Sequence, residues 1–277
     1  MNDMAEQQVF EFDERPTIKG FPELRWTGKR PYRSTQYFPA QLRERYGEEQ
    51  DGWINKIFWG DNLQVMSHLL KEFRGEVDLI YIDPPFDSKA DYQKKISLRD
   101  QTISSDNTSF EEKQYGDIWT NDEYLQFMYE RLILLRELLS DTGSIYLHCD
   151  WHKAHHLRML LDEIFGPKNL VNEIIWSYRT AAGAKNEFNK QHDNIFFYQK
   201  TNLRKYNPSK EKSYTKAKGR KAGIVNYGAT ETEFFEDDEG VYRWSSMRDV
   251  WDIPYINSQA LERSGYPTQK PEALIER

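Results

Sequence analysis

The chain has 277 residues, of which 38% are hydrophobic and 14% aromatic, enough for one large domain or two small ones with a sizeable core. Its apolar runs are too short to cross a bilayer, its acidic start lacks a signal-peptide layout, and a single cysteine excludes an internal disulfide framework, so we expect a cytoplasmic protein. The net charge of −7 argues only weakly against nucleic acid, because phosphate binding depends on where the cations lie.

The first part of the chain carries alternating strand and helix patterns. Residues 1–50, rich in Pro, Arg and aromatics, are expected to form an arm on a core. The stretch INKIFW (54–59) predicts a short strand, and apolar residues at helical spacing predict a helix over 62–73. VDLIYI (77–82) is a continuous β-branched, apolar run, which is typical of a strand buried on both faces.

The alternation continues after a polar stretch at 88–118, which we expect to be a loop. A capping box at Thr120–Glu123 predicts the start of a helix, SIYLH (144–148) predicts a strand, and 151–165 predicts another helix. This order predicts an α/β sheet with helices on both faces. Beyond about Tyr178 the pattern gives way to a polar, variable region that reaches to about 262 and is interrupted by the apolar run 194–199.

Charge is clustered in that variable region. Seven Lys or Arg and one acid lie between Lys205 and Lys221, with two tyrosines among them, whereas 231–239 holds six acids and no base. Either run could equally be a solvated loop.

The stretch YIDPPFD (81–87) places a carboxylate, two prolines and an aromatic directly after an apolar strand. Each proline fixes its own φ and removes a backbone donor, and the first one pushes Asp83 toward an extended conformation. The result is a stiff corner at the carboxyl end of a strand, where α/β sheets bind ligands. Asp83 and the carbonyl of Pro84 could accept both hydrogens of an exocyclic amine, while Phe86 offers a face for a planar base. The alternative is a strand exit whose Asp caps nearby amides.

Five motifs in order resemble the amino-group DNA methyltransferases of the permuted, beta type. They are GDNLQVM (60–66), LIYIDPPF (79–86), GSIYLHCD (143–150), HDNIFFYQK (192–200) and YPTQKPEALIER (266–277). The resemblance implies a Rossmann-like methyltransferase sheet in circularly permuted order with a target-recognition insert. The implied domains are an arm (1–50), a catalytic core (51–178), a target-recognition region (179–262) and the start of a cofactor-binding half (263–277).

The same resemblance implies methyl transfer from S-adenosyl-L-methionine to a flipped base of double-stranded DNA, most often adenine N6, with cytosine N4 as the alternative. Asp83, Pro84, Pro85 and Phe86 would form the base pocket. Asp61 would lie near the cofactor's adenine, and Asp83, Thr268 and Lys270 near its methionine end. The lysines expected to face DNA are Lys210, Lys212, Lys216 and Lys218. Expected partners are a second copy of the chain or a restriction subunit of a restriction-modification system.

One departure from the family is the lack of any Gly-x-Gly, which should form the cofactor loop after 266–277. We therefore expect a C-terminally truncated enzyme that is inactive by itself. A catalytically silent DNA-binding fragment, or an amine methyltransferase acting on RNA or protein glutamine, remain alternatives. The histidines at 148, 152, 155 and 156, with Cys149, suggest a metal, but no acid flanks His152 in the usual pattern. We expect no metal site.

Overall fold

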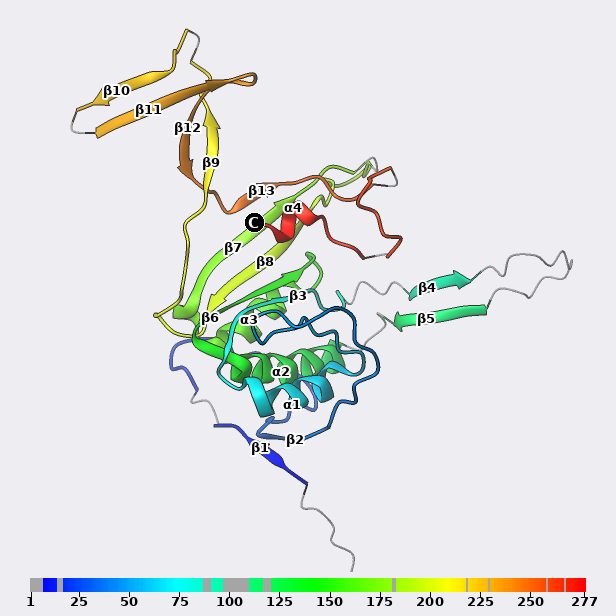
Figure 1. The fold of residues 1–277 in the computed structure, drawn as a ribbon. Coiled ribbons are helices and arrows are strands. Elements are labelled where there is room, and N and C mark those ends of the chain that lie inside the picture. The colour runs from blue at the N-terminus through cyan, green and yellow to red at the C-terminus, as the bar shows by residue number, and fades with distance from the viewer. Residues whose placement is uncertain are drawn as a thin grey trace, which may run out of the picture. The chain divides into compact units, whose positions relative to one another are not determined.

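The computed structural model describes residues 7–13, 17–86, 91–96, 110–116, 121–180, 183–217, 219–228, 230–257, 259–266 and 268–277. Two compact units are present: residues 1–204 with 252–277, and residues 205–251. The class is α/β, as predicted, and the first unit holds a five-stranded mixed sheet in the order β13-β7-β8-β6-β3 (Figure 1). Among the described residues, no helix is both long and apolar enough to cross a bilayer.

Among the four longer strands of the central sheet, three run in one direction and one is reversed. The parallel neighbours are β3 (Val77–Ile82) and β6 (Leu139–Cys149), which need a crossover connection and receive one through a helix. Strand β8 (His192–Gln199) is antiparallel to both β6 and β7 (Leu170–Ser177). The short strand β13 (Val250–Asp252) lies at the edge next to β7. Consequently the carboxyl ends of β3, β6 and β7 meet the amino end of β8 at one edge of the sheet.

Three helices cover one face of this sheet. Helix α1 (Asn62–Phe73) begins at the N-cap Asp61, α2 (Asn121–Leu138) follows, and α3 (Ala154–Phe165) ends at Gly166 before the 3₁₀ turn η1 (Pro167–Asn169). Side chains alternate along strands, so alternate residues of β3, β6 and β8 pack with these helices into the core. The buried strand residues of that core are Ile80, Leu139, Ile145, Leu147, Cys149, Phe196 and Tyr198.

The opposite face differs from the predicted second layer of helices. Among the described residues it is approached by the segment from Ile253 onward, whose one-turn helix α4 (Glu272–Ile275) is shown in red in Figure 1. Trp176, on β7, is buried there and donates from Nε1 to the carbonyl of Ile253 at 2.8 Å. This face carries the polar side chains of the candidate site.

Two expectations for the region around β3 are wrong. Residues 54–59 form no strand, and Ile57 and Trp59 are almost fully exposed because no neighbouring strand pairs with them. Strand β3 has the predicted bounds but is not buried on both faces: Ile80 is buried by the helices, whereas Leu79 is 63% exposed. The cause is that neighbouring strand residues point to opposite faces, and Leu79 lies on the face away from the three helices.

Residues of the N-terminal arm pack on the helical layer. Strands β1 (Val9–Glu11) and β2 (Ser34–Gln36) pair antiparallel, and Lys29 joins Glu163 of α3 at 2.7 Å. A cavity of about 530 Å³ lies between the arm and helices α2 and α3. The polar stretch expected to be a loop contains two antiparallel strands, β4 (Asp91–Ile96) and β5 (Phe110–Gly116).

The second unit is a four-stranded antiparallel sheet in the order β10-β11-β12-β9. Its strands are β9 (Lys210–Tyr214), β10 (Gly223–Tyr227), β11 (Thr230–Asp237) and β12 (Gly240–Ser246). The acidic run 231–239 thus forms most of β11 and its turn into β12, which brings Asp237 within reach of the lysine-bearing strand β9.

Candidate active site

The predicted corner stands at the carboxyl end of β3. The strand ends at Ile82, and Asp83 follows it at once with its side chain 25% exposed. Residues Pro84 to Phe86 continue without regular secondary structure. The carboxylate is therefore held at the sheet edge where ligands bind in α/β folds.

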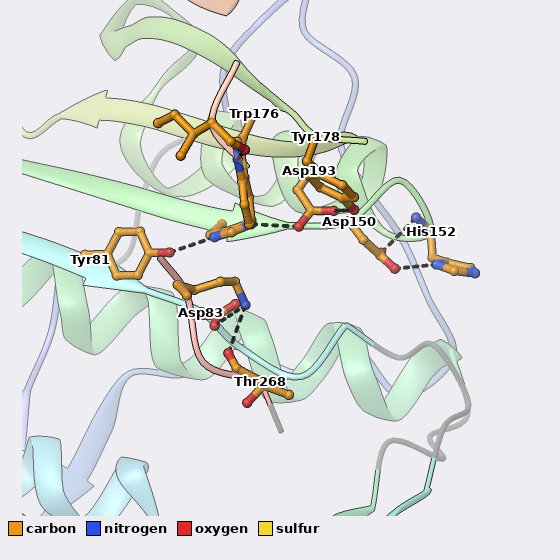
Figure 2. A network of polar contacts seen from close by, with 11 residues as sticks. Tyr81, Asp83, Asp150, His152, Trp176, Tyr178, Asp193 and Thr268 are labelled. Atoms are coloured by element: carbon orange, nitrogen blue, oxygen red, sulfur yellow. Dashed lines mark hydrogen bonds and ion pairs between the residues drawn. The ribbon is translucent and has the colours of Figure 1, made fainter. Parts of the chain in front are cut away.

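Lys270 lies against this corner. Its Nζ donates to Oδ2 of Asp83 at 2.6 Å, one of the dashed lines at Asp83 in Figure 2. The same Nζ lies 5.1 Å from the centroid of the Phe86 ring. A longer contact of 3.5 Å joins the same ammonium to the backbone carbonyl of Thr268. Four predicted site residues from two distant segments of the chain are thus brought together: Asp83, Phe86, Thr268 and Lys270. The ammonium side chain is only 14% exposed, so water screens this ion pair less than a surface pair.

Asp61 belongs to a separate group of contacts. Its Oδ1 accepts from the backbone N–H groups of Leu63 and Gln64 at 3.0 and 3.2 Å, as an N-cap of α1 does. Its Oδ2 accepts from Arg131 at 3.0 Å. Burial lowers the pKa of Arg131, and the charge of Asp61 acts in the opposite direction. Asp61 therefore has a clear structural role, and its contact with a cofactor stays a prediction.

The sequence interpretation missed a chain of polar contacts beside the corner, in which His148 and Asp193 are buried. Tyr81 Oη lies 2.6 Å from Nδ1 of His148, and Nε2 of that histidine lies 3.0 Å from Oδ2 of Asp193. Asp193 Oδ1 accepts from the hydroxyl of Tyr178 at 3.1 Å. We call these four residues the His148 chain (Figure 2). They come from β3, β6, β8 and the residue after β7, all at the same edge of the sheet. The signal in the sequence was a pair of polar residues, His148 and Asp193, inside apolar strands.

The protonation pattern of the His148 chain follows from its surroundings. Burial raises the pKa of the Tyr81 hydroxyl, and the negative charges of Asp83 and Asp193 raise it further. Burial and Asp193 raise the pKa of Tyr178 in the same way. Both tyrosines therefore stay protonated at neutral pH. When Tyr81 donates to Nδ1, the other ring nitrogen, Nε2, is the one that can donate to Asp193.

The other histidines of the suspected metal group lie on or next to α3. His152 contacts Asp150 with both its backbone N–H, at 3.0 Å, and its Nδ1, at 2.5 Å. The rings of His155 and His156 are tilted by 40° to each other, with centroids 4.0 Å apart. Within the described residues, no group of three or more His, Cys, Asp or Glu is arranged to hold a metal ion.

In the second unit, the lysines expected to face DNA differ in their surroundings. Lys210 and Lys216 are exposed, whereas Lys212 pairs with Asp237 at 2.5 Å and lies 4.6 Å from the centroid of the Tyr242 ring. Lys218 lies outside the described residues. The pairing of Lys212 with an acid of β11 could not be read from two separate charge runs.

A family model described as DNA methylase matches residues 77–277, which contain the corner, the His148 chain and Lys270. The match covers more than half of the chain, and the chain belongs to this family of DNA methylases.

Several curated proteins are similar over part of their length. The chain is 33% identical over 149 residues to the type III restriction-modification enzyme StyLTI Mod subunit of Salmonella typhimurium, covering 51% of this chain and 22% of that protein. It is 33% identical over 147 residues to the type II methyltransferase M.EcaI of Enterobacter cloacae, covering 53% and 29%. It is 22% identical over 235 residues to the DNA adenine methyltransferase YhdJ of Escherichia coli, covering 84% and 67%. The chain spans less than a third of the length of the first two relatives.

Solved structures resemble the chain weakly. The M1.HpyAVI–SAM complex has 14% sequence identity and a TM-score of 0.41, covering 78% of this chain and 71% of that one. The cytosine-N4-specific PvuII DNA methyltransferase has 12% identity and a TM-score of 0.38, covering 73% and 58%.

Proposed function

We propose that this chain carries the target-base site of a DNA methyltransferase that transfers a methyl group from S-adenosylmethionine to the exocyclic amine of adenine, at N6. The observation that carries the proposal is the corner itself. There the carboxylate of Asp83 binds an N–H donor, the ammonium of Lys270, which lies over the ring of Phe86. The amine of a flipped base needs the same surroundings, namely a carboxylate acceptor beside an aromatic face.

In the proposed reaction, Asp83 and the backbone carbonyl of Pro84 accept the two N–H groups of the amine. Accepting both hydrogens draws the nitrogen toward a tetrahedral geometry and leaves its lone pair directed away from the acceptors. Pro85 stiffens the corner, so the acceptors are in place before the base arrives. Phe86 stacks on the base, an interaction worth about 1–3 kcal/mol.

The residues near Asp83 suit the methionine end of the cofactor. Lys270 has three N–H donors, of which one is bound to Asp83 and one makes a long contact with Thr268, so a donor remains for a carboxylate. We infer that Lys270 and Thr268 hold that end of S-adenosylmethionine, which when bound supplies an electrophilic methyl group. The contact between the 268–277 segment and the corner also supports the permuted motif order, which we keep as part of the proposal.

The preference for adenine is supported by relatives, one of which is named a DNA adenine methyltransferase. Several others are named Mod subunits of type III restriction-modification enzymes, so a restriction subunit is the partner that we propose. Because the proposed substrate is double-stranded DNA, we also propose that the protein is located in the cytoplasm. We further propose that residues 205–251 contribute to target recognition, through the exposed Lys210 and Lys216.

The test is methyl transfer by the full-length gene product from radiolabelled S-adenosylmethionine to duplex DNA, followed by mass spectrometry of the nucleosides. N6-methyladenine is the expected product. If the product were N4-methylcytosine, the target base would be cytosine and the assignment of adenine would be wrong. Label found in RNA or protein but not in DNA would overturn the whole proposal.

A further inference from the structure

The His148 chain lies on the face of the sheet opposite the three helices. It contacts the corner through the ring of Phe86. The His148 ring is fully buried, with its centroid 5.7 Å from that of Phe86. Trp176 packs edge-on against the same imidazole, 5.4 Å between centroids. Tyr81, which binds Nδ1, lies on β3 two residues before Asp83. One imidazole therefore contacts two residues that flank the acceptor carboxylate.

Each polar side-chain atom of the two middle residues of the His148 chain has a hydrogen-bond partner. His148 binds a partner with each ring nitrogen, and Asp193 binds a partner with each carboxylate oxygen. Burying a histidine and a carboxylate is costly unless the geometry satisfies both, and apolar side chains of similar size often stabilise a core as well or better. The arrangement is therefore poorly explained by core stability alone. It is better explained by a need to fix the orientation of the residues that it contacts.

We infer that His148, oriented by Asp193, is a positioning residue for the proposed methyl transfer, because it holds Tyr81 and the Phe86 ring and thereby fixes the corner between them. This inference rests on the proposed function. Binding sites depend on side chains whose rotamers are locked by a supporting set of hydrogen bonds and packing contacts. His148 acts through Phe86 and Tyr81, without touching the base itself.

The structure offers a pair of Tyr→Phe variants, one beside the corner and one on the helical side of the same sheet. Tyr81→Phe removes a hydroxyl that binds His148, whereas Tyr198→Phe removes a buried hydroxyl of the same sheet that donates to Asp162 at 2.6 Å. A second pair separates hydrogen bonding from packing at position 148. His148→Leu removes both partners, whereas His148→Gln keeps one acceptor and one donor.

Steady-state kinetics of DNA methylation by the full-length gene product is the first readout. Tyr81→Phe and His148→Leu should each lower kcat about tenfold, the cost of one buried hydrogen bond, with KM for DNA nearly unchanged. His148→Gln should recover most of that loss, and Tyr198→Phe should leave kcat as in the wild type. Equal losses in Tyr81→Phe and Tyr198→Phe, or unchanged kcat in both Tyr81→Phe and His148→Leu, would overturn the inference.

A second readout is independent of activity. With fluorine-labelled phenylalanine, the resonance of Phe86 should shift in Tyr81→Phe and His148→Leu and stay in place in Tyr198→Phe. A wild-type protein that transfers no methyl group to DNA would overturn the proposed function, while this resonance would still decide whether the His148 chain holds the corner. A Phe86 resonance that is insensitive to His148→Leu and Tyr81→Phe would overturn the positioning role whatever the activity.

Discussion

Lys270 and Asp83 stand 187 positions apart in the chain, yet Nζ and Oδ2 lie 2.6 Å apart. The pair joins the segment that begins at Thr268 to the corner after β3, so the two are parts of one site. Oδ2 of Asp83 therefore already has a donor, and under the proposed function the other carboxylate oxygen accepts from the amine of a target base.

Asp83→Ala should lower methylation by about 10²-fold or more, since it removes a preorganised polar partner of the reacting amine. Folding should be nearly unaffected, because Asp83 lies at the end of a strand and outside the core. The matched control is Asp78→Ala, which removes an exposed carboxylate from the same strand. Product formation and thermal unfolding of both variants provide the measurement, and near-normal turnover in Asp83→Ala would refute the assignment of the corner.

Lys270→Met should raise KM for S-adenosylmethionine and lower kcat, because it removes the ammonium from Asp83 and from the proposed cofactor carboxylate. Lys200→Met is the control: Lys200 is similarly buried, with 15% of its side chain exposed, and its ammonium binds the backbone carbonyl of Leu139. Cofactor titration by calorimetry distinguishes the two. If both variants bound the cofactor like the wild type, Lys270 would have no part in the cofactor site.

Phe86→Ala should weaken the reaction less than Asp83→Ala, since it removes stacking and leaves both acceptors. The loss in binding of a flipped base should be about 1–3 kcal/mol. Fluorescence of 2-aminopurine placed at the target position measures this directly, because the fluorophore brightens when it leaves the stack. A larger loss of kcat in Phe86→Ala than in Asp83→Ala would contradict the assigned roles.

Neutralising Lys210, Lys212, Lys216 and Lys218 together should weaken DNA binding and flatten its salt dependence, by about one unit of slope for each phosphate that is no longer neutralised. Lys212→Gln by itself should leave the slope almost unchanged, because Asp237 already neutralises that lysine. Lys168→Gln, an exposed lysine of the first unit, controls for net charge. Binding measured across a series of salt concentrations gives the slopes, and an unchanged slope in the fourfold variant would make the run an ordinary solvated surface.

The stability of the fold should decrease at alkaline pH. Burial, with smaller contributions from Asp150 and Asp193, raises the pKa of the Cys149 thiol well above its ordinary value of 9.0. The folded chain keeps this proton when the unfolded chain loses it, so the stabilisation is present below pH 9 and is lost as the pH rises. Urea unfolding at a series of pH values should show this loss, and Cys149→Ala should reduce it. Rapid labelling of the thiol in the folded protein would contradict the burial on which the prediction depends.

Local signals in the sequence were sufficient for the elements next to the corner. Strand β3 and helix α1 have the predicted bounds, because a run of β-branched residues and a helical period are decided by neighbours in the chain. The corner could be found in the same way, since two prolines and a carboxylate after a strand leave few conformations. Residues 54–59 show the limit of such signals: they are as apolar as a strand, but no strand pairs with them.

The His148 chain could not be predicted because it depends on strand register. His148 faces Ile195 across β6 and β8, which sets Asp193 two residues further on and within reach of the imidazole. A shift of one residue would turn Asp193 to the helical face. The same holds for Lys212, whose pairing with Asp237 needs β9, β12 and β11 to lie in the observed order.

The ladder partners of β9 to β12 all fall between residues 210 and 246, within one continuous stretch of chain. A gene segment that encodes this stretch could therefore be exchanged between related enzymes by recombination without breaking a strand pair of the central sheet. Under the proposed function, new sequence specificities could then arise by cassette exchange while Asp83, Lys270 and the residues behind them were inherited intact. Chimeras joined near residues 205 and 248, between β12 and β13, should retain catalysis and acquire the donor's target sequence.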